Sequence, residues 1–237
     1  MRLVKSILFY AFINLWGTII PIIYFPAFIT RSKKLADHGA KMWSLGVVFM
    51  LKKIFNIDYQ VLGLEKVPNE PVIIACKHQS IWETAIMHLI FKRPAYAYKK
   101  ELLKIPFYGW FVKIMTGIRV DRQGGMSAIK DLIKQSKSIL AKGHNIIIFP
   151  QGTRVSFDKS SQDYPYQPGI AAMYLACNVK VVPTALNSGL FWPKNGRINK
   201  NGTIKIEFLD PINIGLAKND FLNELENKIE QASNKLS

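Results

Sequence analysis

The sequence predicts an α/β protein with a mixed sheet flanked by helices, preceded by an N-terminal helical hairpin that associates with a membrane. Short β-branched runs alternate with longer helical stretches, three of these runs end in polar clusters, and an uncharged apolar stretch lies near the N-terminus. Alternating strands and helices are typical of sheets with helices packed on their faces. We therefore divide the chain into membrane-associating helices at 1–56 and an α/β domain at 57–237.

The uncharged stretch at residues 7–29 is about as long as a helix that spans a bilayer. Pro21 and Pro26 interrupt its second half, so it could either cross the membrane or turn back within one leaflet. Basic residues flank both ends, which suits a shallow hairpin with both ends in the cytoplasm. A second apolar helix is expected at residues 39–55, either packed on the domain or lying at the membrane interface.

The first buried strand is expected at residues 72–75, and His78 follows its end. Ser80 and Glu83 match the S-x-x-E capping box, so the next helix is expected to begin at Ser80. Glu83 could serve only as this cap, or it could accept a hydrogen bond from one ring nitrogen of His78. In the second case the other nitrogen is free to act as a general base toward a hydroxyl group.

Two later strands also end in polar clusters. Residues 117–120 lead to Asp121 and Arg122, and residues 145–149 lead to a glycine-containing turn that ends at Arg154. If these strands are parallel to the first, their carboxyl ends share the edge where α/β sheets bind ligands. Arginine side chains and turn amides suit phosphate oxygens, which predicts a phosphate-bearing substrate, although each arginine alone could be an ordinary surface charge.

The remaining elements follow from the same periodicities. Strands are expected at 95–98, 179–186 and 203–209, and helices at 105–115, 126–142, 168–177 and 221–236. The aromatic stretch at 105–110 could line an acyl groove, but large apolar side chains more often pack in a core.

Five motifs occur in order between residues 72 and 186. They are His78…Glu83, Lys99-Lys100-Glu101-Leu102, Gly117…Asp121-Arg122, Phe149-Pro150-Gln151-Gly152-Thr153-Arg154 and Val182-Pro183-Thr184-Ala185. The set resembles the lysophospholipid acyltransferases of the 1-acylglycerol-3-phosphate acyltransferase family, which carry H-x4-D/E, K-x-E-L, G…DR, F-P-E-G-T-R and V-P-x-A. Glu83 stands where many members have Asp, and Gln151 stands where Glu is usual, which puts in doubt any role that needs a charge there.

The resemblance implies a glycerolipid-acyltransferase-like fold. It also implies transfer of a fatty acyl group from acyl carrier protein or acyl-CoA to the free hydroxyl of 1-acylglycerol 3-phosphate, making phosphatidic acid. His78 would be the base and Glu83 its orienting partner. The implied substrate-binding residues are Lys99, Arg122, Gln151, Gly152, Thr153 and Arg154. Two alternatives stay open, namely another acceptor such as glycerol 3-phosphate or a lyso-aminolipid, and a non-catalytic membrane lipid-binding relative.

The chain carries a net charge of +16, with 32 basic and 16 acidic side chains. An anionic membrane surface is a better-fitting partner than nucleic acid, because the charge is spread along the chain and no nucleic-acid-binding motif is present. Cys76 and Cys177 are expected to be reduced, structural thiols. We expect no metal site and no cofactor beyond the acyl co-substrate. The expected location is the inner, cytoplasmic membrane, with the active site facing the cytoplasm.

Overall fold

A computed structural model describes residues 2–105, 108–121, 124–198 and 200–236. These residues form one seven-stranded sheet with the order β1-β7-β6-β2-β5-β3-β4. The strands are β1 (Ile57–Leu62), β2 (Ile73–Cys76), β3 (Ala95–Lys99), β4 (Gly117–Val120), β5 (Ile146–Ile148), β6 (Val181–Leu186) and β7 (Gly202–Phe208). Strands β6, β2, β5, β3 and β4 are parallel to one another, and β6 pairs with β7 in the antiparallel direction. The predicted mixed sheet is confirmed.

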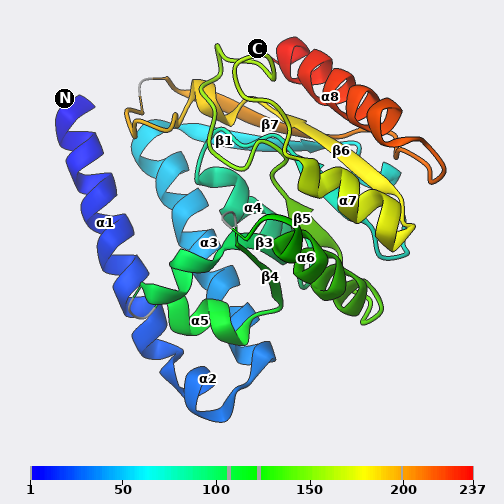
Figure 1. The fold of residues 1–237 in the computed structure, drawn as a ribbon. Coiled ribbons are helices and arrows are strands. Elements are labelled where there is room, and N and C mark those ends of the chain that lie inside the picture. The colour runs from blue at the N-terminus through cyan, green and yellow to red at the C-terminus, as the bar shows by residue number, and fades with distance from the viewer. Residues whose placement is uncertain (1, 106–107, 122–123, 199, 237) are drawn as a thin grey trace.

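Helices cover both faces of the sheet (Figure 1). They are α1 (Arg2–Ile23), α2 (Phe25–Thr30), α3 (Lys33–Phe55), α4 (Trp82–Ile90), α5 (Tyr108–Ile114), α6 (Gly125–Leu140), α7 (Pro168–Cys177) and α8 (Lys218–Lys235). Short 3-10 helices lie at η1 (Leu64–Lys66), η2 (Lys100–Lys104) and η3 (Ser188–Leu190).

Alternate residues of β2 belong to two separate cores. Ile74 and Cys76 pack in a cluster with residues of α3 and α4, whereas Ile73 and Ala75 pack in a cluster with residues of α6, α7 and α8. Successive side chains of a strand point to opposite faces, so a strand that is buried on both sides is apolar at every position. This is why β2 has no polar residue and why the chain can place a polar group only after the strand ends.

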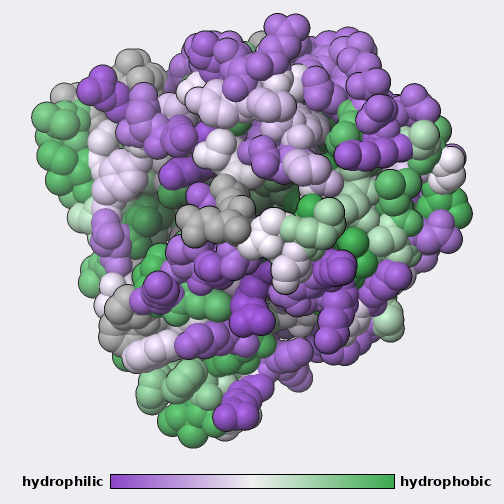
Figure 2. Space-filling view, viewed as in Figure 1, coloured by the Kyte–Doolittle hydropathy of each residue, from purple (hydrophilic) through white to green (hydrophobic). Residues whose placement is uncertain are grey.

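The N-terminal helices form a hairpin with α2 at its tip, and α1 runs beside α3 (Figure 1). Residues 3–23 are long and apolar enough to cross a membrane, by length and composition. Phe9 is fully buried, however, and its ring contacts those of Phe55 and Trp192, so this part of α1 shares the core of the α/β domain. Apolar side chains remain exposed along α1 and around α2, where Figure 2 shows hydrophobic surface.

The sequence and the structure differ most clearly in four elements. The second apolar helix, expected at residues 39–55, begins earlier, at Lys33. The helix expected to begin at Ser80 begins at Trp82, with Ile81 at the N-cap position, and Ser80 Oγ accepts a hydrogen bond from the amide of Trp82. The helix expected at residues 105–115 is divided into η2 and α5. The strand at Ile57–Leu62 was not predicted, because it is an edge strand whose mostly exposed side chains give no clear burial pattern.

Candidate active site

The parallel pairing of β2 with β5 brings two of the predicted polar clusters together. His78 lies in the loop between β2 and α4, and Arg154 lies in the turn after β5. The amide of Val155 donates a 2.8 Å hydrogen bond to the carbonyl oxygen of His78. The two loops are thus joined by backbone, and the residue before Val155 is held beside the histidine.

Glu83 lies next to His78, at a distance longer than the sequence led us to expect. Its Oε1 atom is 3.7 Å from His78 Nδ1, which is close enough for an ion pair and too long for a hydrogen bond. Among the described residues, Nδ1 has no hydrogen-bond partner. The carboxylate is held away because Oε1 accepts hydrogen bonds from the amides of Gln79 (2.5 Å) and Ser80 (2.8 Å).

Glu83 therefore forms its half of the capping box, whereas the hydrogen bond expected from His78 to Glu83 is not formed. Ser80 Oγ accepts a 3.2 Å hydrogen bond from the amide of Trp82, while Glu83 reaches back to the amides before the helix. Glu83 is fully buried, and its Oε2 atom has no partner among the described residues.

The imidazole of His78 is oriented by an aromatic contact. It stacks on the ring of Phe149 with 4.0 Å between centroids and an interplanar angle of 15°. Phe149 follows β5 directly, so the strand that leads to Arg154 also supports the histidine. The side chain of His78 remains 16% exposed, which leaves it open to a substrate.

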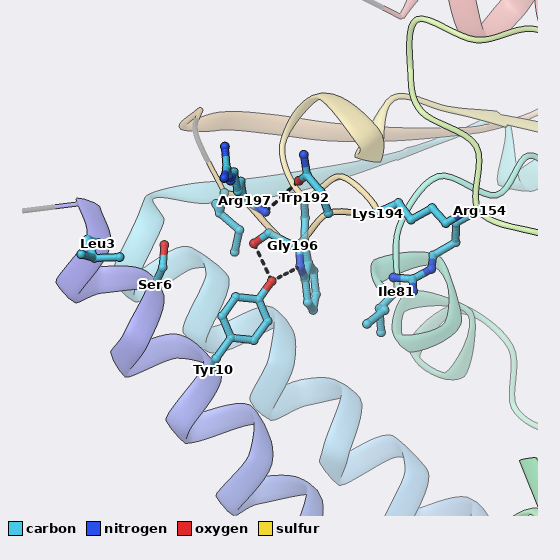
Figure 3. Close-up of a pocket in the computed structure, with 11 residues that line it drawn as sticks. Leu3, Ser6, Tyr10, Ile81, Arg154, Trp192, Lys194, Gly196 and Arg197 are labelled. Carbon is cyan, nitrogen blue, oxygen red and sulfur yellow. Dashed lines mark hydrogen bonds between the residues drawn. The ribbon is translucent and has the colours of Figure 1, made fainter.

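The turn after β5 needs its glycine. Gly152 has a φ of +68°, a left-handed conformation that other residues rarely adopt, and its amide donates a 2.9 Å hydrogen bond to Phe149. Arg154, two residues on, lines a pocket of about 740 Å³ beside Ile81 (Figure 3). The far side of this pocket is formed by Tyr10 of α1 and by the loop at residues 192–198.

Among the described residues, the other predicted substrate-binding residues do not line this pocket. Thr153 is half-buried beside Arg154, and Gln151 is buried with both of its side-chain amide atoms unpartnered among the described residues. Lys99 is exposed at the end of β3 and does not line the pocket. Arg122 lies outside the described residues. Asp121 forms a 2.6 Å ion pair with Lys100.

The cysteines do not offer a competing nucleophile. Cys76 is fully buried, and burial together with the nearby Glu83 carboxylate raises the pKa of its thiol well above the ordinary value. Burial also raises the pKa of Cys177. Within the described ranges, no group of three or more His, Cys, Asp and Glu side chains could hold a metal ion.

A buried ion pair that the sequence did not predict lies next to the histidine in the chain. Lys77 Nζ lies 2.6 Å from Glu230 Oε2, and the lysine side chain is only 2% exposed. Tyr166 donates a 3.2 Å hydrogen bond to the other oxygen of Glu230. The sequence contained one signal, a lysine placed between a buried strand and His78, but its partner is 153 residues away.

Comparison with known proteins identifies the family of this chain. A family model described as Acyltransferase matches residues 58–187. The 1-acyl-sn-glycerol-3-phosphate acyltransferase of Pseudomonas aeruginosa is 32% identical over 210 residues, which cover 87% of this chain and 79% of that protein. This chain belongs to the acyltransferase family. The resemblance inferred from the five motifs is confirmed, and the protein is an acyltransferase enzyme.

Other relatives agree with this membership. The protein of the same name from Saccharomyces cerevisiae is 27% identical over 183 residues, which cover 76% of this chain and 60% of the yeast protein. The crystal structure of PlsC, the 1-acyl-sn-glycerophosphate (LPA) acyltransferase from Thermotoga maritima, superposes with a TM-score of 0.79. It covers 100% of this chain and 98% of that chain at 19% identity. The acyltransferase fold expected from the sequence is therefore confirmed.

Proposed function

We propose that this acyltransferase moves a fatty acyl group from acyl carrier protein or acyl-CoA to the free hydroxyl of 1-acylglycerol 3-phosphate, forming phosphatidic acid. The names of the relatives from Pseudomonas aeruginosa and Saccharomyces cerevisiae support this acceptor. The observation that carries the proposal is the hydrogen bond between Val155 and His78, because it joins the loop of His78 to the turn of Arg154 and so supports a role for both residues at one site.

In this reaction His78 acts as the general base. It removes the proton from the acceptor hydroxyl as the hydroxyl oxygen attacks the thioester carbonyl carbon. The new C–O bond forms, the C–S bond breaks, and the departing thiolate accepts the proton from the imidazolium. Glu83 stabilises the positive charge on the ring while it exists, as a carboxylate does in a catalytic triad.

The acceptor is held by its phosphate. Arg154 offers a planar fork of donors that suits phosphate oxygens, and the open turn at Gly152 lets the headgroup approach the backbone. We assign supporting roles to Lys99 and Arg122 from the family resemblance. Gln151 and Thr153 line the same turn, where Gln151 replaces a carboxylate that would repel the phosphate.

We also propose that α1 and α2 embed in one leaflet of the inner membrane, with the active site facing the cytoplasm. Phe9 packs against the domain and Tyr10 is hydrogen-bonded to it, so α1 lies along the domain surface. Its other side exposes Leu8, Leu15 and Ile22, each more than half accessible. The excess of basic residues adds attraction to anionic lipids, about 1 kcal/mol for each one near the surface.

Purified protein in anionic lipid vesicles, given mixed acyl thioesters and lysolipids, tests this function by mass spectrometry of the products. We expect phosphatidic acid from 1-acylglycerol 3-phosphate. The His78→Ala variant should lose about 10²–10⁴ of the rate, the usual contribution of a general base. His144→Ala is the matched control, because His144 lies before β5, at the opposite end of the strand from the site.

The outcomes separate the possibilities. Undiminished turnover by His78→Ala would remove the proposed base. Products formed only from glycerol 3-phosphate or from a lyso-aminolipid would show that this compound is the acceptor instead. Lipid binding without any acyl transfer would favour a non-catalytic relative.

A further inference from the structure

Two cations beyond the predicted site line the same pocket as Arg154. Lys194 and Arg197 come from the loop that follows η3 and line this pocket of about 740 Å³. The Lys194 side chain extends toward Arg154, whereas Arg197 lies near Gly196 (Figure 3). Among the described residues, none of the three cations has a carboxylate within ion-pair distance, and no Asp or Glu lines the pocket. Three uncompensated positive charges around one cavity favour an anionic ligand.

Helix α1 holds this loop in place. The hydroxyl of Tyr10 donates a 2.6 Å hydrogen bond to the carbonyl oxygen of Gly196 and accepts a 3.0 Å hydrogen bond from Trp192 Nε1 (Figure 3). Trp192 is itself buried against Phe9. The two bonds flank Lys194, so α1 holds the backbone at Gly196 on one side of it and the indole of Trp192 on the other.

Gly196 shows how closely the loop and α1 approach each other. Its φ is +78°, and a Cβ atom at this position would lie 2.7 Å from the hydroxyl oxygen of Tyr10. A glycine is required there both by the left-handed backbone and by the close contact. The loop therefore has one defined position against the helix, which places Arg197 next to the pocket.

We propose that Lys194 and Arg197, together with Arg154, bind the phosphate group of a substrate, and that Tyr10 is a positioning residue for their loop. This inference rests on the proposed function. Lysine and arginine side chains form strong, charge-assisted hydrogen bonds to phosphate oxygens. Apolar Leu3 and Ile81 line the same pocket, so a phosphate and an adjoining hydrocarbon chain can be bound together. The phosphate belongs either to the lysolipid headgroup or to the thioester donor.

A double variant, Lys194→Ala with Arg197→Ala, tests the phosphate site. With the phosphate on the lysolipid, kcat/KM for 1-acylglycerol 3-phosphate should fall at least about tenfold, since one charge-assisted hydrogen bond contributes about that much. The value for 1-acylglycerol, which has no phosphate, should not change. With the phosphate on the donor, the KM for acyl-CoA should rise by a similar factor instead.

The matched control is Lys218→Ala with Lys235→Ala, which removes the same charge from exposed positions on α8, away from α1 (Figure 1). It should leave the preference for the phosphorylated acceptor and both KM values unchanged. A pocket variant that keeps its acceptor preference and both KM values would overturn the inference.

Phosphate binding can also be measured without turnover. Inorganic phosphate should raise the unfolding temperature of the full chain in detergent more than potassium chloride of equal ionic strength does, and the pocket variant should lose this difference. If the wild-type protein acylates no lysolipid but keeps the phosphate effect, the proposed function fails and the pocket stands. If it acylates 1-acylglycerol 3-phosphate and the phosphate effect is equal in both proteins, the pocket assignment fails alone.

Tyr10→Phe tests the positioning role, because it removes both hydrogen bonds and keeps the ring. We expect a several-fold rise in KM for the phosphorylated substrate that the double variant identifies, with kcat nearly unchanged. A general structural defect would lower kcat as well. A Tyr10→Phe enzyme with wild-type KM values would exclude the positioning role.

Discussion

The amide of Val155 donates a hydrogen bond to the carbonyl oxygen of His78, and this bond joins the turn after β5 to the loop after β2. The two strands are neighbours and parallel, so both loops leave the sheet at the same edge. Phe149 adds a second link by stacking on the imidazole. The position of the histidine thus depends on the same turn that presents Arg154.

Replacing Glu83 separates its capping role from its effect on His78. Glu83→Gln keeps an oxygen that can accept from Gln79 and Ser80 but removes the charge, so it should change stability by less than about 1 kcal/mol and lower kcat about tenfold or more. Glu83→Ala should also cost roughly 1–3 kcal/mol of stability, because it leaves two amides unpaired. Denaturant unfolding and steady-state kinetics measure both. Full activity in Glu83→Gln would reduce this residue to a helix cap.

Gln151 is expected to be dispensable for stability. Its buried amide atoms have no partner among the described residues, so Gln151→Met, which removes both polar groups, should leave the free energy of unfolding unchanged or raise it. Gln151→Glu should lower it by roughly 2 kcal/mol or more, since it buries an unpaired charge. Thermal unfolding of both variants in detergent checks this. A strong gain of activity in Gln151→Glu would mean that this chain is a weakened family member.

Removing only one partner of the buried ion pair of Lys77 and Glu230 is expected to destabilise the protein. Glu230→Leu leaves the ammonium of Lys77 uncompensated in the interior and should cost about 3–5 kcal/mol. Combining it with Lys77→Met should recover most of that loss, because two apolar side chains can replace a buried pair. Equal destabilisation by the single and double variants, measured by denaturant unfolding, would contradict this coupling.

His88 should make stability depend on pH. Burial lowers the pKa of His88 to about 4 in the folded protein, against an ordinary value of 6.5. Between these values the unfolded chain binds more protons, so the free energy of unfolding rises with pH over this range. Relative to His88→Gln, the wild-type protein should lose about 2 kcal/mol between pH 7.5 and pH 5. Identical pH profiles of the two proteins would rule this out.

Much of the fold follows from local patterns. Strand β2 is apolar because both of its faces are covered, α7 begins with a proline at the position where a helix accepts one, and α1 has no charge over most of its length. The edge strand β1 was not predicted, since only its first residue is buried and the next three are exposed, as in a loop. Periodicity reports burial, and an edge strand has little of it.

For the site, the sequence placed His78, Glu83 and Arg154 after strand ends and predicted the capping box. It could not give the 3.7 Å separation of the imidazole and the carboxylate, because that distance depends on which amides Glu83 binds. The basic loop with Lys194 and Arg197 carried no recognisable motif. Its relation to the site depends on Tyr10, which lies 186 residues from Gly196 in the chain.

The sequence by itself determined most of the strands and helices, the polar clusters at the strand ends and the apolar N-terminal region, because each depends on residues that are close in the chain. Only the tertiary structure decided that β5 lies beside β2, that Glu230 neutralises Lys77, and that α1 completes the pocket of Arg154. These are contacts between distant residues. They depend on how helices and sheet pack together, which no local pattern encodes.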